Sequence, residues 1–265
     1  MRRSASALAL GALLALAGCT GPTTSPTSAT TAPTPGSPSV GADGHRGDTP
    51  AATRTASPTP GAASSTVALD GPAGAATLVV EAPAAARLTT RPAAAGSTRV
   101  TVRGVPAGGS VVVRATAPEG ASLRDELDGT VAVDAADGTA LAGLARPDGG
   151  SARLDHGRLE VTSAGGGEVT FWAGTGRPRS AVWGAHEGGR SLAVDPNTWA
   201  RGAGLAGGEA TWSALVVERP DADRPGMHDQ LVCHALGAPD KATWNLEPWR
   251  PDVGLVATLA ARCNP

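Results

Sequence analysis

The sequence contains no isoleucine and no tyrosine, and lysine and phenylalanine each occur once among its 265 residues. Alanine, glycine, arginine and proline are in surplus, which is the residue usage of a GC-rich genome. The positions at which scarce residues persist are therefore informative. All asparagines and all tryptophans lie beyond Phe171, as does Lys241. This change in composition predicts two folded parts that meet near residue 171.

Basic residues do not cluster in the C-terminal third of the chain. From residue 180 onward there are seven Arg or Lys residues and ten Asp or Glu residues, 7 − 10 = −3. Nucleic-acid binding requires a basic patch that neutralises phosphates. Neither a P-loop nor a dinucleotide fingerprint occurs, although glycine is abundant. We therefore expect no nucleic-acid partner and no cofactor.

Long apolar runs are also absent, apart from one at the start of the chain. Residues 7–17 are apolar and follow Arg2 and Arg3, as in a secretory signal, and they are too few to span a bilayer as a helix. The run continues into Leu-Ala-Gly-Cys, which ends at Cys19 and resembles the lipobox of bacterial lipoproteins. This pattern predicts a signal peptide at 1–18 and a diacylglyceryl lipid on Cys19 that anchors the chain to the outer face of the cell membrane. The alternative is an ordinary secretory signal in which Cys19 has no role.

The segment that follows, residues 19–63, consists mainly of Thr, Ser, Pro, Gly and Ala. It has no aromatic residue and no leucine, so it cannot bury enough apolar surface to offset its chain entropy. We expect a disordered tether between the lipid and the folded parts.

Residues 64–175 are predicted to form a β-rich domain. Short Val-rich runs such as TLVV, SVVVRAT and RLEVTS have the length of strands. Between such runs lie pairs in which glycine admits the positive φ of tight hairpins, namely Asp128-Gly129, Asp137-Gly138, Asp148-Gly149 and His156-Gly157. The pattern favours a β-sandwich or a small barrel without residues for chemistry, that is, a spacer.

Residues 178–265 are predicted to form a smaller α+β domain. The expected elements are a hairpin over 181–196, a flexible glycine-rich loop over 201–209, helices over 208–220 and 226–238, and a strand or short helix over 252–265. With Cys19 lipidated, Cys233 and Cys263 remain, and in an oxidising compartment they predict a disulfide. A staple of this kind suits a domain with a thin core.

Several motifs of this region are specific: GMHDQLVCHA, KATWNLEPWRPDVG and the terminal ARCNP. They resemble an actinobacterial family of secreted proteins and lipoproteins, known as domain of unknown function 2599. The resemblance covers about the last 85 residues. It implies an extracytoplasmic domain, and it implies no particular activity.

The segment WNLEPWRP, residues 244–251, allows two interpretations. Two prolines favour a rigid, irregular or edge segment rather than a central strand. The segment is then either part of the core, with both tryptophans buried, or the wall of a binding site. In the second case the binding residues are Trp244, Asn245, Glu247, Trp249 and Arg250. Tryptophan rings stack on sugars and bury apolar ligands.

Catalysis is the alternative to binding. The candidate residues are His234 together with Asp229 or Glu247, and Gln230 would share a helical face with His234. There is no G-x-S-x-G for a serine hydrolase, and the spacing of His228 and His234 does not suit a metal pair on a helix. We expect no metal site. His234 has the character of a hydrogen-bonded structural histidine, and the pair His186-Glu187 that of a solvated turn.

The sequence therefore predicts a mainly β protein, with a β-sandwich-like domain followed by a disulfide-closed α+β domain. We expect a lipid-anchored envelope protein that is not an enzyme and binds a glycan, a lipid or a protein. A small extracytoplasmic hydrolase is the alternative. Burial of Trp244, Trp249 and His234 distinguishes these hypotheses: an enzyme requires an exposed His234, and a binding module requires an exposed tryptophan.

Overall fold

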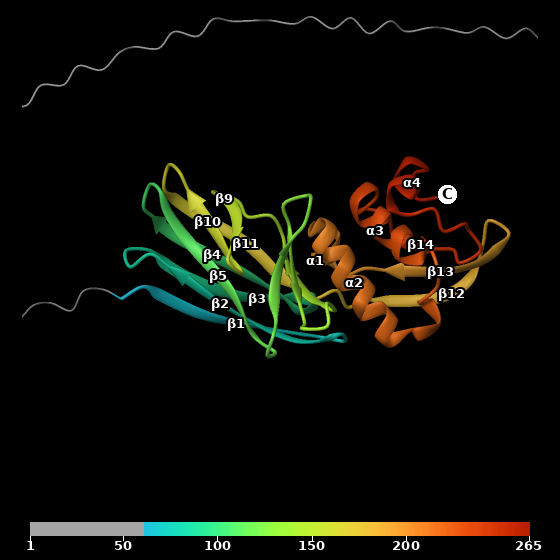
Figure 1. The fold of residues 1–265 in the computed structure, drawn as a ribbon, viewed down its shortest axis with the longest axis horizontal. Helices are drawn as coiled ribbons and strands as arrows, with labels where there is room; N and C mark the ends of the chain where they lie inside the picture. The colour runs from blue at the N-terminus through green and yellow to red at the C-terminus, as the bar shows by residue number, and fades with distance from the viewer. Residues whose placement is uncertain (1–60) are drawn as a thin grey trace, which may run out of the picture. The chain divides into compact units, whose positions relative to one another are not determined.

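A computed structural model describes residues 61–265 (Figure 1). The predicted signal peptide, the lipidation at Cys19 and almost the whole predicted tether lie outside these residues. In this range no helix combines the length and apolarity needed to cross a membrane. The described chain is mainly β, with a small α+β region at its C-terminal end, which confirms the predicted fold class (Figure 1).

Two antiparallel sheets form the β-rich part, which we define as residues 63–174. The five-stranded sheet has the order β1-β2-β5-β10-β9, with β1 Ala63–Gly71, β2 Gly74–Ala82, β5 Gly109–Ala117, β9 Ser151–Asp155 and β10 Arg158–Ser163. The six-stranded sheet has the order β3-β4-β11-β8-β7-β6, with β3 Arg87–Ala93, β4 Ser97–Val105, β6 Ser122–Asp125, β7 Val131–Asp134, β8 Ala140–Leu144 and β11 Gly167–Gly174. A short 3-10 turn, η1 (Ala94–Gly96), joins β3 to β4.

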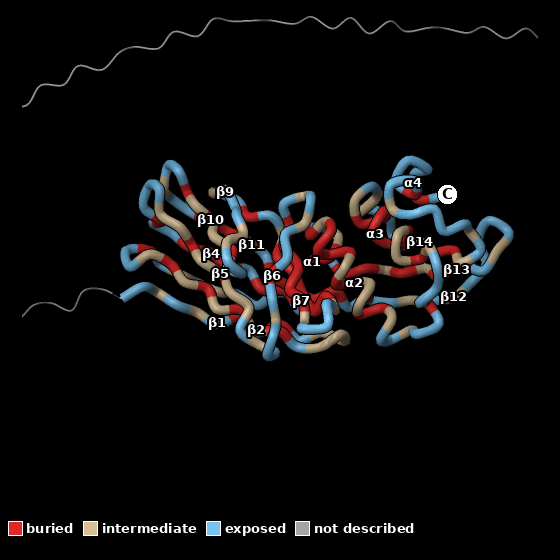
Figure 2. Tube along the Cα trace, viewed as in Figure 1, coloured by how far each residue is buried: buried red, intermediate tan, exposed pale blue. Residues whose placement is uncertain are grey.

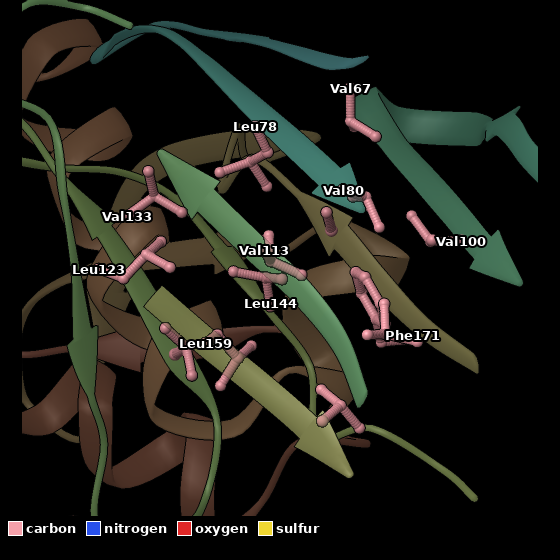
Figure 3. Packing of buried hydrophobic residues seen from close by; sticks show 14 of the residues in the cluster. Val67, Leu78, Val80, Val100, Val113, Leu123, Val133, Leu144, Leu159 and Phe171 are labelled. Atoms are coloured by element: carbon pink, nitrogen blue, oxygen red, sulfur yellow. The ribbon is translucent and has the colours of Figure 1, made fainter. Parts of the chain in front are cut away.

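Apolar side chains from both sheets form one core. Leu78 and Val113 come from the five-stranded sheet, and Val100, Leu144 and Phe171 come from the six-stranded sheet (Figure 3). Alternation along the strands places these residues on the inner faces. The arrangement is a sandwich with a core of Val, Leu and Ala, and Phe171 is its one aromatic residue.

Three of the four predicted hairpin turns are present, whereas Asp148-Gly149 joins β8 of the six-stranded sheet to β9 of the five-stranded sheet. Gly129, Gly138, Gly149 and Gly157 all have positive φ, and they lie in connections between consecutive strands. His156 has a φ of 46° in the two-residue turn from β9 to β10, so it is a tolerated turn residue.

In the C-terminal part, residues 180–265, helices pack on a small sheet. The antiparallel sheet has the order β12-β13-β14, with β12 Ser180–His186, β13 Gly189–Asp195 and β14 Trp244–Leu246. The helical elements are α1 Thr198–Gly202, α2 Gly204–Glu218, η2 Pro220–Ala222, α3 Met227–Gly237 and α4 Leu255–Ala260. The predicted hairpin and both predicted helices are confirmed, and the chain closes with a short helix.

The glycine-rich segment 201–209 is not the loop that its composition predicts, because most of it forms the first turns of α2. A Cβ on Gly207 would lie 2.4 Å from the carbonyl oxygen of Ala200, and a Cβ on Gly143 of β8 would lie 2.8 Å from the Cβ of Ala206. Small residues therefore let α2 approach α1 and β8 closely. Tertiary packing outweighs the low helix propensity of glycine here.

Helix α2 covers part of the outer face of the six-stranded sheet. Strands β7 and β8 are buried along their whole length, whereas β3 is exposed or half-buried (Figure 2). The N-terminus of α2 is capped from the β-rich part: Leu205 N donates to Asp128 Oδ2 at 2.8 Å and Ala206 N donates to Thr130 Oγ1 at 3.1 Å. A carboxylate at this end of a helix also complements its dipole.

Cys233 of α3 and Cys263 form the predicted disulfide, with a sequence separation of 30 residues. A closed loop of this length stabilises a fold by about 3–4 kcal/mol in the chain-entropy description. We expect the double variant Cys233→Ser/Cys263→Ser to lose about this free energy of unfolding, measured by urea denaturation. A reductant should destabilise the wild type and leave the double variant unchanged; equal stability of the two oxidised proteins would contradict the prediction.

Candidate functional site around Glu247

Strand β14 positions the WNLEPWRP segment. It pairs with β13 at the edge of the small sheet, with Val194 opposite Trp244 and Leu192 opposite Leu246. All four of these side chains are buried, because alternate residues of β14 face the helices. Asn245 points the other way and is half-buried. The predicted edge position is therefore confirmed, and Trp244 belongs to the core.

Helix α3 holds the main chain of this segment through two polar side chains. Gln230 is fully buried; its Oε1 accepts from Glu247 N at 2.8 Å and its Nε2 donates to Glu247 O at 3.1 Å. One turn later, His234 Nε2 donates to Asn245 O at 3.1 Å. Gln230 and His234 thus share one helical face, as their spacing predicts. These bonds satisfy backbone groups that an irregular edge segment would otherwise leave unpaired.

The carboxylate of Glu247 is only 2% exposed and has two partners. His186 Nδ1 donates to Oε1 at 3.1 Å, and Arg250 Nε donates to Oε2. Arg250 also contacts the carboxylate of Glu187 and, at 3.4 Å, the main-chain oxygen of Pro265. A buried charge needs such compensation. The network, which we call the Glu247 brace, joins the β12–β13 turn, the WNLEPWRP segment and the C-terminus.

Trp249 lies at the surface beside the brace and is 46% exposed. The Arg250 guanidinium carbon lies 4.5 Å from the centroid of its ring, and a Cβ on Gly189 would lie 2.1 Å from its Nε1. Gly189 therefore leaves the space that the indole occupies, and the cation–π contact helps to hold the ring. The side chains of His186 and Glu187 are half exposed. Together Trp249, His186 and Glu187 form an exposed surface on a rigid support.

The five predicted binding residues thus have different environments. Trp244 is core, Glu247 and the mostly buried Arg250 form the brace, Asn245 accepts a hydrogen bond from Thr243 at 3.1 Å, and Trp249 alone is substantially exposed. His186 and Glu187, predicted as a solvated turn, are partners of this segment. Sequence reasoning missed them because they lie about 60 residues away, and only the pairing of strands β13 and β14 brings them close.

Three groups of the brace are possible metal ligands. One ligand atom from each of His186, Glu187 and Glu247 lies within 4.8 Å of the others. Arg250 contacts both carboxylates, so a guanidinium already serves as their counter-ion. The donor types suit a divalent cation, but a cation would have to displace this arginine.

The catalytic pair proposed from the sequence is not assembled. His234 is 3% exposed, and its hydrogen-bond partner is a main-chain carbonyl. Asp229 lies instead beside His228, with 3.9 Å between Oδ1 and Nδ1, and the imidazole bonded to Glu247 is that of His186. His234 does not meet the requirement of an exposed catalytic base, and it has the structural role considered as its alternative.

The pKa of His234 is lowered to about 4, mainly by burial and further by the charge of Lys241. In the unfolded chain its ordinary value is about 6.5. The unfolded state therefore binds a proton first as the pH falls, so stability should decrease between about pH 6.5 and pH 4, by up to about 3 kcal/mol. Urea unfolding over this range should show a shallower pH dependence in His234→Gln than in the wild type. The control is His156→Gln in an exposed turn; an unchanged slope in His234→Gln would contradict the assignment.

A second surface feature of the C-terminal part lies beside α3. A hollow of about 470 Å³ is lined by Trp212, His228, Asp229 and Asp252, among others. The imidazole of His228 packs against the indole of Trp212 in a tilted orientation, and its Nε2 lies 3.2 Å from Glu209 Oε2. Burial lowers the pKa of His228, but the hydrogen bond and charge of Glu209, together with Asp229, raise it overall.

These features define a class of protein: a β-sandwich is followed by a disulfide-closed α+β domain, in which a buried glutamate holds an edge segment that carries an exposed tryptophan.

The family described as "Protein of unknown function (DUF2599)" matches residues 179–265. An uncharacterized protein of Mycobacterium tuberculosis is 36% identical over 115 residues, covering 38% of this chain and 76% of that protein. One from Mycobacterium leprae is 37% identical over 81 residues, covering 29% of this chain and 60% of that protein. No solved structure matches significantly. The chain belongs to the DUF2599 family, as its C-terminal motifs predict.

Proposed function

We propose that the chain is a lipid-anchored protein of the cell envelope. The signal peptide at 1–18, the lipid on Cys19 and the tether at 19–63 would place the folded parts at the outer face of the membrane. The Cys233–Cys263 bond supports this proposal, because disulfides persist in oxidising compartments. Labelled palmitate should be incorporated into the wild-type protein in cells and not into Cys19→Ser.

We further propose that the DUF2599 domain is a binding module for a cell-envelope glycan. The observation that carries this proposal is the half-exposed indole of Trp249 on the Glu247 brace. A rigid, amphipathic aromatic ring offers contact area to a sugar at low entropic cost. Beside it, the Glu187 carboxylate can accept from sugar hydroxyls, and the imidazole of His186, held at Nδ1, leaves Nε2 for a second hydrogen bond.

The test uses residues 20–265, which keep every described residue and lack the lipidation cysteine. Soluble cell-wall saccharide fragments are titrated while intrinsic fluorescence and acrylamide quenching are recorded. We expect one fragment class to protect Trp249, and Trp249→Ala to weaken its binding by about 5- to 150-fold, if stacking of a sugar on the indole contributes as much as stacking of a nucleic-acid base does, about 1–3 kcal/mol. Trp172→Ala removes an exposed tryptophan of the β-rich part and serves as control. Equal affinities of the wild type and Trp249→Ala would rule out this site.

One observation favours hydrolysis as a second candidate. A buried carboxylate that holds Nδ1 of a half-exposed imidazole is the arrangement that orients a general base. The base would then be His186 rather than His234. If the bound saccharide is slowly cleaved, His186→Gln should abolish turnover while binding persists. Turnover unaffected by this substitution would exclude the candidate.

A further inference from the structure

Four arginines occupy the outward face of strands β3 and β4 in the β-rich part. Arg87 lies directly opposite Arg103, and Arg91 lies directly opposite Arg99. All four side chains are exposed. Like charges that face each other across a pair of strands destabilise a sheet. Two such pairs on one face are therefore unfavourable for the fold by itself, and they become favourable when an anionic partner lies over them.

Few acidic groups offset this charge. Glu168 of β11 pairs with Arg103 at 2.6 Å, and Asp148 lies opposite Thr170 at the border of the face. The four arginines and the two acidic residues give this face a net charge of 4 − 2 = +2, whereas the formal net charge of the whole chain is −2. The row between the two arginine pairs consists of hydroxyl residues: Thr89 is exposed, and Thr101 and Thr170 are buried.

An aromatic residue and an apolar hollow border the same face. Trp172 of β11 lies opposite Arg99, is 38% exposed, and has the Arg99 guanidinium carbon 5.7 Å from its ring centroid. Next to it, a mainly apolar hollow of about 350 Å³ is lined by residues of both parts, including Ala93, Ala145, Trp172 and Trp199. Helix α2 packs on β7 and β8, whereas the residues of β3 are exposed or half-buried.

We propose that this face binds the surface of an anionic bilayer. Phosphate groups of phospholipids would lie on the two arginine pairs, because guanidinium groups bind phosphate oxygens in a bidentate manner. Trp172 would sit in the interfacial region, where tryptophan is favoured. The tryptophan and the apolar hollow favour an amphiphile over a soluble polyanion, which has no apolar group to place there. This surface is separate in sequence from the Trp249 surface, and neither proposal depends on the other.

The experiment measures binding of residues 20–265 to vesicles of phosphatidylcholine and phosphatidylglycerol (3:1) and to vesicles of phosphatidylcholine alone. We expect binding to the anionic vesicles only, and weaker binding at high salt. Arg91→Gln/Arg99→Gln should reduce binding roughly 25-fold, at about fivefold per arginine. Because one unfavourable pair is removed, its thermal midpoint should not fall. Arg153→Gln/Arg158→Gln removes the same charge from β9 and β10 and should change binding less than twofold.

Trp172 provides a second readout. Phosphatidylglycerol with brominated acyl chains should quench the tryptophan emission of the bound wild type, and Trp172→Phe should lose most of this quenching. Three results would overturn the proposal: no binding to anionic vesicles, equal weakening by the two arginine double variants, or no quenching by brominated lipid. Polyphosphate that binds as tightly as the vesicles do, without such quenching, would show that the face recognises a soluble polyanion instead.

Discussion

Trp244→Ala is expected to reduce the free energy of unfolding by about 3–5 kcal/mol, as large-to-small changes of buried tryptophan do. Trp244 is fully buried and packs among Leu192, Leu215 and Leu231 from β13, α2 and α3. Because it lies where strand and helices meet, its removal leaves a cavity that three elements border. Urea denaturation followed by circular dichroism measures the change.

Trp249→Ala is the matched control from the same eight-residue segment. The residue is 46% exposed, and its ring lies against Gly189 and Arg250 rather than in the core, so we expect a loss of about 1 kcal/mol or less. The two variants thus distinguish a tryptophan that stabilises the fold, Trp244, from one that is available for recognition at the surface, Trp249. Similar losses for both variants would show that the whole segment is core, and would remove the basis for a binding surface at Trp249.

Glu247→Ala is expected to cost about 3–5 kcal/mol, because it leaves the mostly buried Arg250 without its main counter-charge. It also leaves His186 Nδ1 without a partner. Removing one member of a buried ion pair costs more than the pair itself contributes, since the remaining charge stays desolvated. The loss should appear as a lower urea midpoint, together with increased acrylamide quenching of Trp249.

Glu187→Ala provides the control for this second prediction. Its carboxylate contacts the same Arg250 but is half exposed, so the pair is screened by water and should contribute at most about 1 kcal/mol. A large loss in Glu187→Ala together with a small loss in Glu247→Ala would mean that the exposed carboxylate, not the buried one, holds the arginine.

Much of the fold could be predicted from local signals. Strand-length Val runs separated by Asp-Gly and His-Gly turns predicted the sandwich, and apolar spacing ended by Gly237 and Pro239 predicted α3. These signals act within a few residues, so sequence alone carries them. The start of α2 was mispredicted for the opposite reason: Gly207 and Gly208 are small because α1 and α3 pack against them, and that contact is invisible in the local sequence.

The candidate site was predicted only in part. WNLEPWRP was identified as an edge segment with aromatic and charged groups, but the roles of its residues depend on which side chains face the helices. Alternation along β14 buries Trp244, and the turn after β14 exposes Trp249. His186 belongs to the site because it hydrogen-bonds Glu247, which lies 61 residues further along the chain. The hydrogen bond from His234 to a main-chain carbonyl depends on how α3 packs.

By itself, the sequence determined the mainly β class, the disulfide pair and the membership of residues 179–265 in the DUF2599 family, since these depend on residue type, spacing and motif. Only the tertiary structure decided which charges are buried, which tryptophan meets solvent and which arginines face each other. Those properties arise from strand register and from packing between distant segments. Asp128 is an example: its sequence predicts a turn, and the fold makes it the cap of a helix 77 residues further along the chain.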